Sequence, residues 1–237
     1  MIKRLKMFLE NRDLIVYLAK NDFKTKYAGS YLGIVWAFVQ PIVTICLYWF
    51  VFELGFRSTA VDDAPFVLWL MAGLVPWFFF SEALINATNC FIEYSYLVKK
   101  VVFNISVLPL VKIISSLFVH VFFVLLTLVF YVFYGLYPGI IVIQLIYYMI
   151  CTIALVLSMA YFTSSIAIFF KDTIQIINIF MTIGVWMTPI LWNMDSMKLP
   201  VWVKMLLKLN PMFYVVKGFR DTLITQKWFV SSLSLTV

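Results

Sequence analysis

The sequence predicts an all-α, polytopic helical membrane protein, and its composition and charge distribution both point to this fold class. Hydrophobic residues make up 64% of the 237 residues and charged residues only 12%, against about 45–50% and about a quarter in ordinary soluble domains. Charged residues are absent from two long runs, residues 27–52 and 113–170. A helix crosses the bilayer core with about 20 apolar residues, so the first run holds one span and the second holds two.

The same composition argues against other classes of protein. A water-soluble fold of this size exposes too much surface to hide so many apolar side chains, which excludes a soluble enzyme or a nucleic-acid-binding module. We therefore expect no nucleic-acid partner. A membrane β-barrel requires segments of about 10 residues that alternate apolar and polar side chains. Residues 118–134, FVHVFFVLLTLVFYVFY, are instead apolar on every face, which favours helices.

The N-terminal segment, residues 1–28, is predicted to form one or two amphipathic helices. Its first 26 residues contain seven Lys/Arg and three Asp/Glu, and no apolar stretch typical of a secretory signal interrupts them. Apolar side chains share faces with Lys and Arg between them, as in helices that lie in the membrane interface. We expect this segment to lie along the membrane rather than to cross it.

Five full transmembrane helices are predicted after this segment, at residues 31–52, 64–92, 113–134, 140–168 and 173–194. The sequence GLYPG at 135–139 separates the third span from the fourth, because two glycines and a proline favour a turn.

Residues 195–227 change in character. Lysines alternate with apolar residues there, and Pro200 and the Asn210-Pro211 pair divide the segment into short amphipathic helices. The last apolar stretch, 228–237, has 10 residues, roughly 15 Å of helix against a core of about 30 Å. Either this stretch does not span the membrane, or it is the start of a truncated sixth helix.

The positions of Lys and Arg predict the orientation of the chain. With the N-terminus inside, the cytoplasmic segments 1–28, 93–112 and 171–172 contain eleven positive residues. The segment 195–227 would lie outside with six more, against the simple rule, but early helices usually set the topology. We therefore keep the N-terminus inside.

Two predicted spans carry small or polar residues at helical spacing along their whole length. The stripe of the first span consists of Ser30, Gly33, Ala37, Gln40, Thr44 and Tyr48, and that of the fifth of Gln175, Asn178, Thr182, Trp186, Pro189 and Asn193. Such stripes form by helix packing through small residues and amides, or they line a polar conduit. Trp36, Tyr48, Trp77 and Trp186 lie deep in the spans or on the stripes, where aromatic faces suit sugar rings.

Other chemistry-bearing residues are isolated. Glu82 and His120 lie inside predicted spans, where ionisable groups indicate a proton relay or a satisfied packing role. The three cysteines are scattered in apolar runs. The sequence contains no phosphate-binding loop, no cluster with metal-ligand spacing and no nucleophile motif, so we predict no catalytic residue, metal or cofactor in this chain.

Three sequence motifs resemble one family. They are KYAGSYLGIVWAFVQPI at 26–42, MTPILW at 187–192 and NPMFYVVKGFRDTL at 210–223. In this order and spacing they resemble the membrane subunits of bacterial type-2 ABC exporters for polysaccharides, which export O-antigen, teichoic acid and related cell-wall glycans. The resemblance implies a multi-pass, homodimeric permease of the cytoplasmic (inner) membrane that acts on a lipid-linked polysaccharide. ATP and Mg²⁺ would be bound by a partner ATPase subunit.

The resemblance also assigns roles to individual residues. Coupling to the ATPase would involve the N-terminal segment and the loop after the second span, with Arg12, Asp13, Lys20, Tyr94, Tyr96, Lys99 and Lys100. The first and fifth spans would line the conduit at the homodimer centre, with Trp36, Gln40, Thr44, Tyr48, Trp77, Asn178, Thr182 and Trp186. Short outer gate helices would contain Asn210, Pro211, Lys217 and Arg220, and their positive charges would meet anionic lipid or a phosphate-bearing carrier head group.

Two other classes of function compete with this one. A proton-coupled secondary transporter would use Glu82 and His120, but such proteins usually contain internal repeats, and none is evident. An intramembrane enzyme that handles lipid-linked sugars would need a catalytic acid or nucleophile, and the carboxylates of this sequence are isolated. Co-purification with an ATPase would separate the exporter from both.

Overall fold

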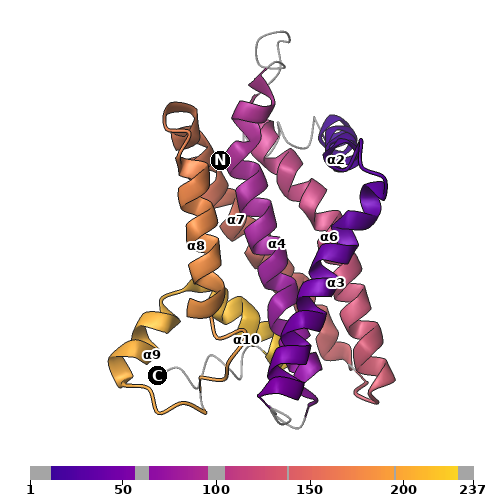
Figure 1. Cartoon of the computed structure of the whole chain (residues 1–237), viewed down its shortest axis with the longest axis vertical. Helices are drawn as coiled ribbons and strands as arrows, with labels where there is room; N and C mark the ends of the chain where they lie inside the picture. Colours follow the sequence, from indigo (N-terminus) through magenta and orange to yellow (C-terminus); the bar gives the residue numbers. More distant parts are fainter. Residues whose placement is uncertain (1–11, 57–63, 96–104, 138, 195, 229–237) are drawn as a thin grey trace. The chain divides into compact units, whose positions relative to one another are not determined.

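The computed structural model describes residues 12–56, 64–95, 105–137, 139–194 and 196–228, and every regular element in these ranges is a helix (Figure 1). The long elements, in order, are α2 (Arg12–Lys26), α3 (Trp36–Trp49), α4 (Phe66–Glu93), α6 (Leu108–Phe133), α7 (Gln144–Phe169), α8 (Thr173–Met187), α9 (Val201–Lys208) and α10 (Pro211–Leu223). Short helical turns adjoin three of them: η1 (Gly33–Val35), η2 (Phe50–Gly55), η3 (Ile105–Val107) and η4 (Ile140–Ile143). Predictions for 1–11, Tyr96, Lys99, Lys100 and the start of a sixth span at 229–237 lie outside the described residues.

Four helices of the described residues are long and apolar enough to cross a membrane. They are Gly33–Gly55, Phe66–Glu93, Ile105–Phe133 and Ile140–Phe169. These match the first four predicted spans. The fifth prediction corresponds to α8, an apolar helix of 15 residues, about 22 Å long.

Two helix ends differ from the sequence prediction. The third span begins with η3 and α6 rather than at residue 113, so Lys112 lies inside a helix and is only 5% exposed. Its charge is tolerated there because it is paired with carboxylates, as described below. The fifth span ends at Met187 rather than at residue 194, because Pro189 lacks an N–H and disfavours helical backbone at Thr188.

The chain forms two compact units, and each unit draws on three stretches of sequence. The first unit consists of Met1–Val39, Phe79–Val119 and Ile153–Ile179, and the second of Gln40–Phe78, His120–Thr152 and Phe180–Val237. The division falls within α3, α4, α6, α7 and α8. Each of these helices therefore contributes one part to each unit.

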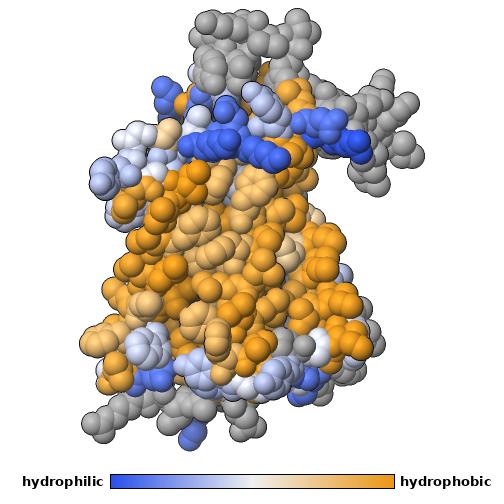
Figure 2. Space-filling view, turned by 90° about the vertical axis from the view of Figure 1, so that its right-hand side faces the viewer, coloured by the Kyte–Doolittle hydropathy of each residue, from blue (hydrophilic) through white to orange (hydrophobic). Residues whose placement is uncertain are grey.

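The helix α4 supplies the core of both units. Of the apolar 18-residue stretch of α4 that could cross the membrane, 78% is buried, whereas only 11% of the corresponding stretch of Gly33–Gly55 is buried. Leu68 and Leu74 are fully buried in the second unit, and Leu84 and Ala87 in the first. Elsewhere many large apolar side chains are exposed, and hydrophobic residues cover most of the face drawn in Figure 2. Such a surface fits a lipid environment.

A glycine sets the distance between α10 and α7 in the second unit. A Cβ atom built on Gly218 would lie 2.1 Å from Cζ of Tyr148, so the aromatic ring rests directly on the α10 backbone. Gly218 is buried, and Tyr148 is also in contact with Phe219, with ring centroids 6.4 Å apart. No larger residue fits at position 218 without moving the ring.

We predict that Gly218→Ala destabilises the protein by about 1–3 kcal/mol, the usual cost of overpacking. The readout is the melting temperature of the purified protein in detergent. Gly139→Ala is the matched control, because a Cβ atom there meets nothing within 4 Å. Equal melting temperatures for the two variants would contradict the close approach of α10 to Tyr148.

Candidate functional site

In the first unit, the helix α2 presents one buried stripe to the rest of the protein. Ile15, Ala19 and Asp22 follow each other at helical spacing and are all buried. The two apolar residues pack with Val107 and Val111 from η3 and α6. The buried stripe therefore begins apolar and ends with a carboxylate, which needs a partner once it leaves water.

The partner of Asp22 is the buried Lys112 of α6. The Lys112 Nζ atom lies 2.7 Å from Asp22 Oδ1 and 2.8 Å from Glu93 Oε1 at the end of α4. The hydroxyl of Tyr94 donates a hydrogen bond of 2.5 Å to Asp22 Oδ1. Asp22 and Lys112 are about 5% exposed, whereas the Glu93 side chain is 49% exposed. We call these four residues the polar lock; it joins α2, α4 and α6.

A second ion pair ties the last residue of α2 to α4. Lys26 Nζ lies 2.5 Å from Glu82 Oε1, and both side chains are about one third exposed. The pKa of Lys26 is raised above its ordinary value of 10.5: burial lowers it, but attraction by and hydrogen bonding to Glu82 outweigh the burial. Lys26 also lies over the ring of Tyr27, 5.4 Å from its centroid. The helix α2 is thus fastened at two points.

The predicted coupling residues take different positions around this lock. Arg12 and Asp13 form an ion pair with side chains 77% and 95% exposed, and Lys20 is exposed on α2. Tyr94 belongs to the polar lock itself. Arg12, Asp13 and Lys20 therefore lie on the exposed surface of α2, outside its buried stripe.

In the second unit, α10 is held by its first residues and by Arg220. The side chain of Asn210 accepts a hydrogen bond from the backbone N–H of Met212 and so caps the helix. Its Nδ2 donates to Thr188 Oγ1 at 2.8 Å, just beyond α8. Pro211 occupies the first turn of the helix, where its missing N–H is not needed. The predicted gate residues Asn210 and Pro211 thus define where α10 begins.

Arg220 binds three backbone carbonyls, two just beyond the end of α8 and one in α4. It donates to Pro189 O at 2.6 Å, to Ile190 O at 2.8 Å and to Trp69 O at 3.4 Å. Its guanidinium also lies 3.4 Å from the centroid of the Trp69 ring, a cation–π contact. Five donors in one planar group allow such multiple bonding, which a lysine cannot provide. Arg220 thereby satisfies carbonyls left free where α8 ends.

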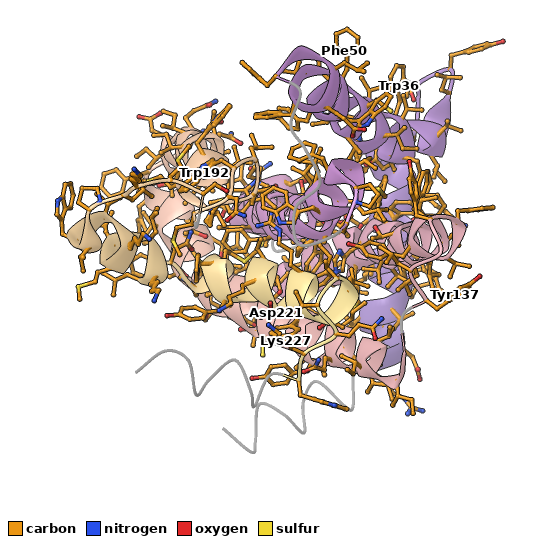
Figure 3. All side chains as sticks on the ribbon, turned by 90° about the horizontal axis from the view of Figure 1, so that it is seen from below. Trp36, Phe50, Tyr137, Trp192, Asp221 and Lys227 are labelled. Atoms are coloured by element: carbon orange, nitrogen blue, oxygen red, sulfur yellow. The ribbon has the colours of Figure 1, made fainter. Side chains whose placement is uncertain are left out.

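The chain beyond α10 folds back within the second unit. The Lys227 N–H donates to the Asp221 carbonyl at 2.9 Å, and Gln144 Nε2 donates to the Lys227 carbonyl at 3.0 Å. Figure 3 labels Asp221 and Lys227 at this end of α10. This return places the C-terminal part of the described chain against α7.

The predicted conduit residues differ in exposure. Those of the first span are exposed (Trp36, Gln40) or half-buried (Thr44, Tyr48), and those of α8 are half-buried (Asn178) or exposed (Thr182, Trp186). Trp77 is instead buried, at 5% exposure, and its ring rests on Gly184 of α8 in the second unit. The Trp192 indole donates to Trp186 O at 2.9 Å. Stripe residues of α3 and α8 therefore leave polar and aromatic groups on the surface of the single chain.

Sequence reasoning missed the polar lock. The predicted second span ends at residue 92 and the predicted third begins at 113, so Glu93 and Lys112 both fall just outside the predicted spans. Asp22 lies 90 positions from Lys112 and 72 from Tyr94, so local spacing could not pair them. The available signal was a carboxylate that continues the apolar stripe of Ile15 and Ala19.

A helical fold with four apolar helices of spanning length defines a multi-pass membrane protein, which in bacteria lies in the inner membrane. Residues 13–224 match the model of the ABC-2 type transporter family, so the chain belongs to that family. It is similar to the O-antigen export system permease protein RfbA of Myxococcus xanthus, with 26% identity over 220 residues, 93% of this chain and 84% of the relative. It is equally similar to RfbA of Klebsiella pneumoniae, with 26% identity over 215 residues, 88% of this chain and 79% of the relative.

We predict that Lys112→Met destabilises the protein by about 3–5 kcal/mol, because it leaves the buried Asp22 carboxylate without its counter-charge. The measurement is thermal unfolding in detergent. Arg12→Gln is the control, since it removes a cation from an ion pair that is exposed to solvent. A melting temperature of Lys112→Met equal to that of the control would show that the polar lock contributes nothing.

We predict that Arg220→Lys also destabilises the protein, although it keeps the charge. Hydrogen bonds to a charged donor contribute about 1.5–3 kcal/mol each, and lysine cannot reach both Pro189 and Ile190 carbonyls with a planar fork. Lys227→Arg serves as a control that exchanges the same two residue types at an exposed position. If Arg220→Lys unfolds at the wild-type temperature, the guanidinium geometry is unimportant.

Proposed function

We propose that this chain is the transmembrane subunit of an ATP-driven exporter that moves a lipid-linked polysaccharide across the cytoplasmic membrane. The observation that carries the proposal is the similarity over most of the chain to O-antigen export permeases, together with membership of the ABC-2 type transporter family. In this proposal the chain is no enzyme. A partner ABC ATPase binds ATP and Mg²⁺ and supplies the energy.

The polar lock supports a route for coupling. The ATPase would contact the exposed face of α2, where Arg12, Asp13 and Lys20 are found, and the loop after α4. Because Lys112 joins α2 to the end of α4 and to α6, a displacement of α2 would pull directly on both helices. Because α2 is held by two ion pairs, Asp22–Lys112 and Lys26–Glu82, it resists sliding along α4 and α6 more than apolar contact alone would allow.

The exposed stripes support a conduit between two copies. Gln40, Thr182 and Trp186 are exposed in the single chain, and polar groups facing lipid are costly. A second copy of the chain would cover these surfaces and would leave the stripes facing a hydrated path. Exposed aromatic faces such as Trp186 would then stack on sugar rings.

No specific observation favours the proton-coupled alternative. Glu82, one of its two candidate residues, is engaged in an ion pair with Lys26. The other, His120, is buried in the second unit with its ring 6.3 Å from that of Phe219. Both arrangements fit structural roles.

The direct test of the proposed function is co-expression with the ABC ATPase that we propose as its partner. The two proteins should co-purify, and ATP hydrolysis in liposomes should rise when lipid-linked glycan is added. Cells without the chain should accumulate that glycan inside and lose it from the surface. Normal surface glycan in the deletion strain, or substrate movement that follows a proton gradient without ATP, would overturn the proposal.

The conduit makes a separate prediction about side chains. Gln40→Leu should slow export and Trp186→Ala should slow it more, because the latter removes a stacking face of a side chain that is 53% exposed. Both variants should keep the wild-type melting temperature, since neither side chain is in the core. Export is measured as surface glycan per cell. Normal export together with a lowered melting temperature would assign the stripes to packing instead.

A further inference from the structure

The polar lock contains one more carboxylate than its lysine requires. Lys112 Nζ lies 2.7 Å from Asp22 Oδ1 and 2.8 Å from Glu93 Oε1, and a single carboxylate would already neutralise the ammonium group. Because both oxygens contact the same nitrogen atom, the two carboxylates are also close to each other and repel. Asp22 and Glu93 therefore compete for the charge of Lys112.

The two competing carboxylates belong to different parts of the first unit. Asp22 is the member of the polar lock that lies on α2, whereas Glu93 and Lys112 lie on α4 and α6. If α2 moves away, Asp22 enters water, where a carboxylate is well solvated, and Lys112 keeps Glu93 as its partner. The large penalty of leaving a buried ion unpaired is thereby avoided.

Apart from the polar lock, the N-terminal part of α2 is held by a small apolar contact. Ile15 and Ala19 are the two apolar residues among the three that α2 buries, and they pack with Val107 and Val111. All other residues of α2 are exposed or half-buried. The docking of this part of the helix therefore depends strongly on the pair of Asp22 with Lys112.

The connection that follows α2 has the features of a hinge. Lys26, the last residue of α2, is paired with Glu82 of α4. Beyond it, Gly29 and Gly33 have φ angles of +89° and +52°, which glycine adopts without strain. A Cβ atom on either glycine would meet nothing within 4 Å, so neighbouring atoms do not confine this backbone. Such a connection can absorb a rotation of α2 while α3 keeps its place.

We propose that the polar lock is a latch that opens: α2 swings away from α4 and α6 about the Gly29–Gly33 connection, and Glu93 retains Lys112 while Asp22 is released. The lock resists sliding of α2 along its neighbours, but a swing separates Asp22 from Lys112 without sliding. In the latched state a displacement of α2 reaches α4 and α6, and in the released state it does not. This last consequence, unlike the release itself, rests on the proposed function.

The test measures how often the buried stripe of α2 becomes accessible to water. Ile15→Cys, at a position that is 3% exposed, is made in the full chain with Cys46, Cys90 and Cys151 replaced by alanine. Its rate of reaction with a water-soluble maleimide is measured in detergent. Val156→Cys, at a fully buried position of α7 in the same unit, reports opening of the whole unit. Ile15→Cys should react at least about ten-fold faster, because a local opening requires less free energy than unfolding.

Charge variants in the Ile15→Cys protein then identify the competing partner. Glu93→Gln should slow the reaction about ten-fold, because it removes the competitor of Asp22 and leaves Lys112 without an alternative partner. Asp22→Asn should accelerate the reaction about ten-fold, since the docked helix loses its ion pair. Asp172→Asn, the matched control, removes a negative charge at an exposed position of the same unit and should leave the rate unchanged.

A purely structural role for Glu93 predicts the opposite sign, so each other outcome overturns the proposal. Faster or unchanged reaction of Ile15→Cys with Glu93→Gln, or faster reaction of Val156→Cys with the same change, would show that Glu93 is no competitor and only stabilises the docked helix or the unit. Equal rates for Ile15→Cys and Val156→Cys would show that α2 leaves only when the unit unfolds. An unchanged rate with Asp22→Asn would show that the lock does not hold α2. The measurement uses neither ATPase nor substrate, so its failure is distinct from failure of the proposed function.

Discussion

A charge removed from water must find its partners inside the protein, and this constraint organises both units. In the first unit, Lys112 is 5% exposed and bridges Asp22 and Glu93. In the second, Arg220 binds backbone carbonyls of Pro189 and Ile190. An unpaired ion in either place would cost several kcal/mol. In both units these contacts fasten an amphipathic helix, α2 or α10, to the parts of the unit that surround it.

The apolar and polar interactions have separate tasks in this arrangement. Burial of α4 provides the core, since 78% of its apolar 18-residue stretch is buried. Apolar contact alone, however, does not fix the position of one helix along another. Directional contacts do so: Asp22 can meet Lys112 in only one register, and the Tyr148 ring fits only above Gly218. In a transporter subunit, apolar burial that forms the core and directional contacts that fix the register are expected if helices move together rather than slide past one another.

The sequence predicts the transmembrane helices well because their signal is local. Charge-free runs located the first, third and fourth spans, and the GLYPG sequence placed the turn between the third and the fourth. The start of the third span differs from the structure because partners distant in sequence decide it. The start of α6 was set too late, because Lys112 looked like a span boundary until Asp22 and Glu93 neutralised it. Helix α8 ends early, at Met187, because of Pro189, which is a local signal; what the sequence could not show is that the carbonyls freed there bind Arg220, 30 residues from Ile190.

In the candidate site, too, the sequence predicted local patterns but not contacts between distant residues. The spacing of Gln40, Thr44 and Tyr48 was evident in the sequence, and the structure leaves these residues exposed or half-buried. The alternation of lysines with apolar residues in 195–227, typical of short amphipathic helices, was also evident. The role of Arg220 as a ligand for carbonyls was not, because nothing in a sequence shows which backbone groups lack partners. The family of the chain, in contrast, could be inferred from three short motifs and is confirmed by the match over 13–224.

The most direct measurement is a double-mutant cycle between Asp22 and Lys112, with Asp22→Asn, Lys112→Met and the double variant compared in thermal unfolding. If the two residues form one buried pair, each single change should destabilise the protein, and the double variant should lose clearly less than the sum, with a coupling free energy of about 0.5–3 kcal/mol. Additive losses would contradict the account, because they would mean that α2 is held by other contacts and that Lys112 does not fasten it.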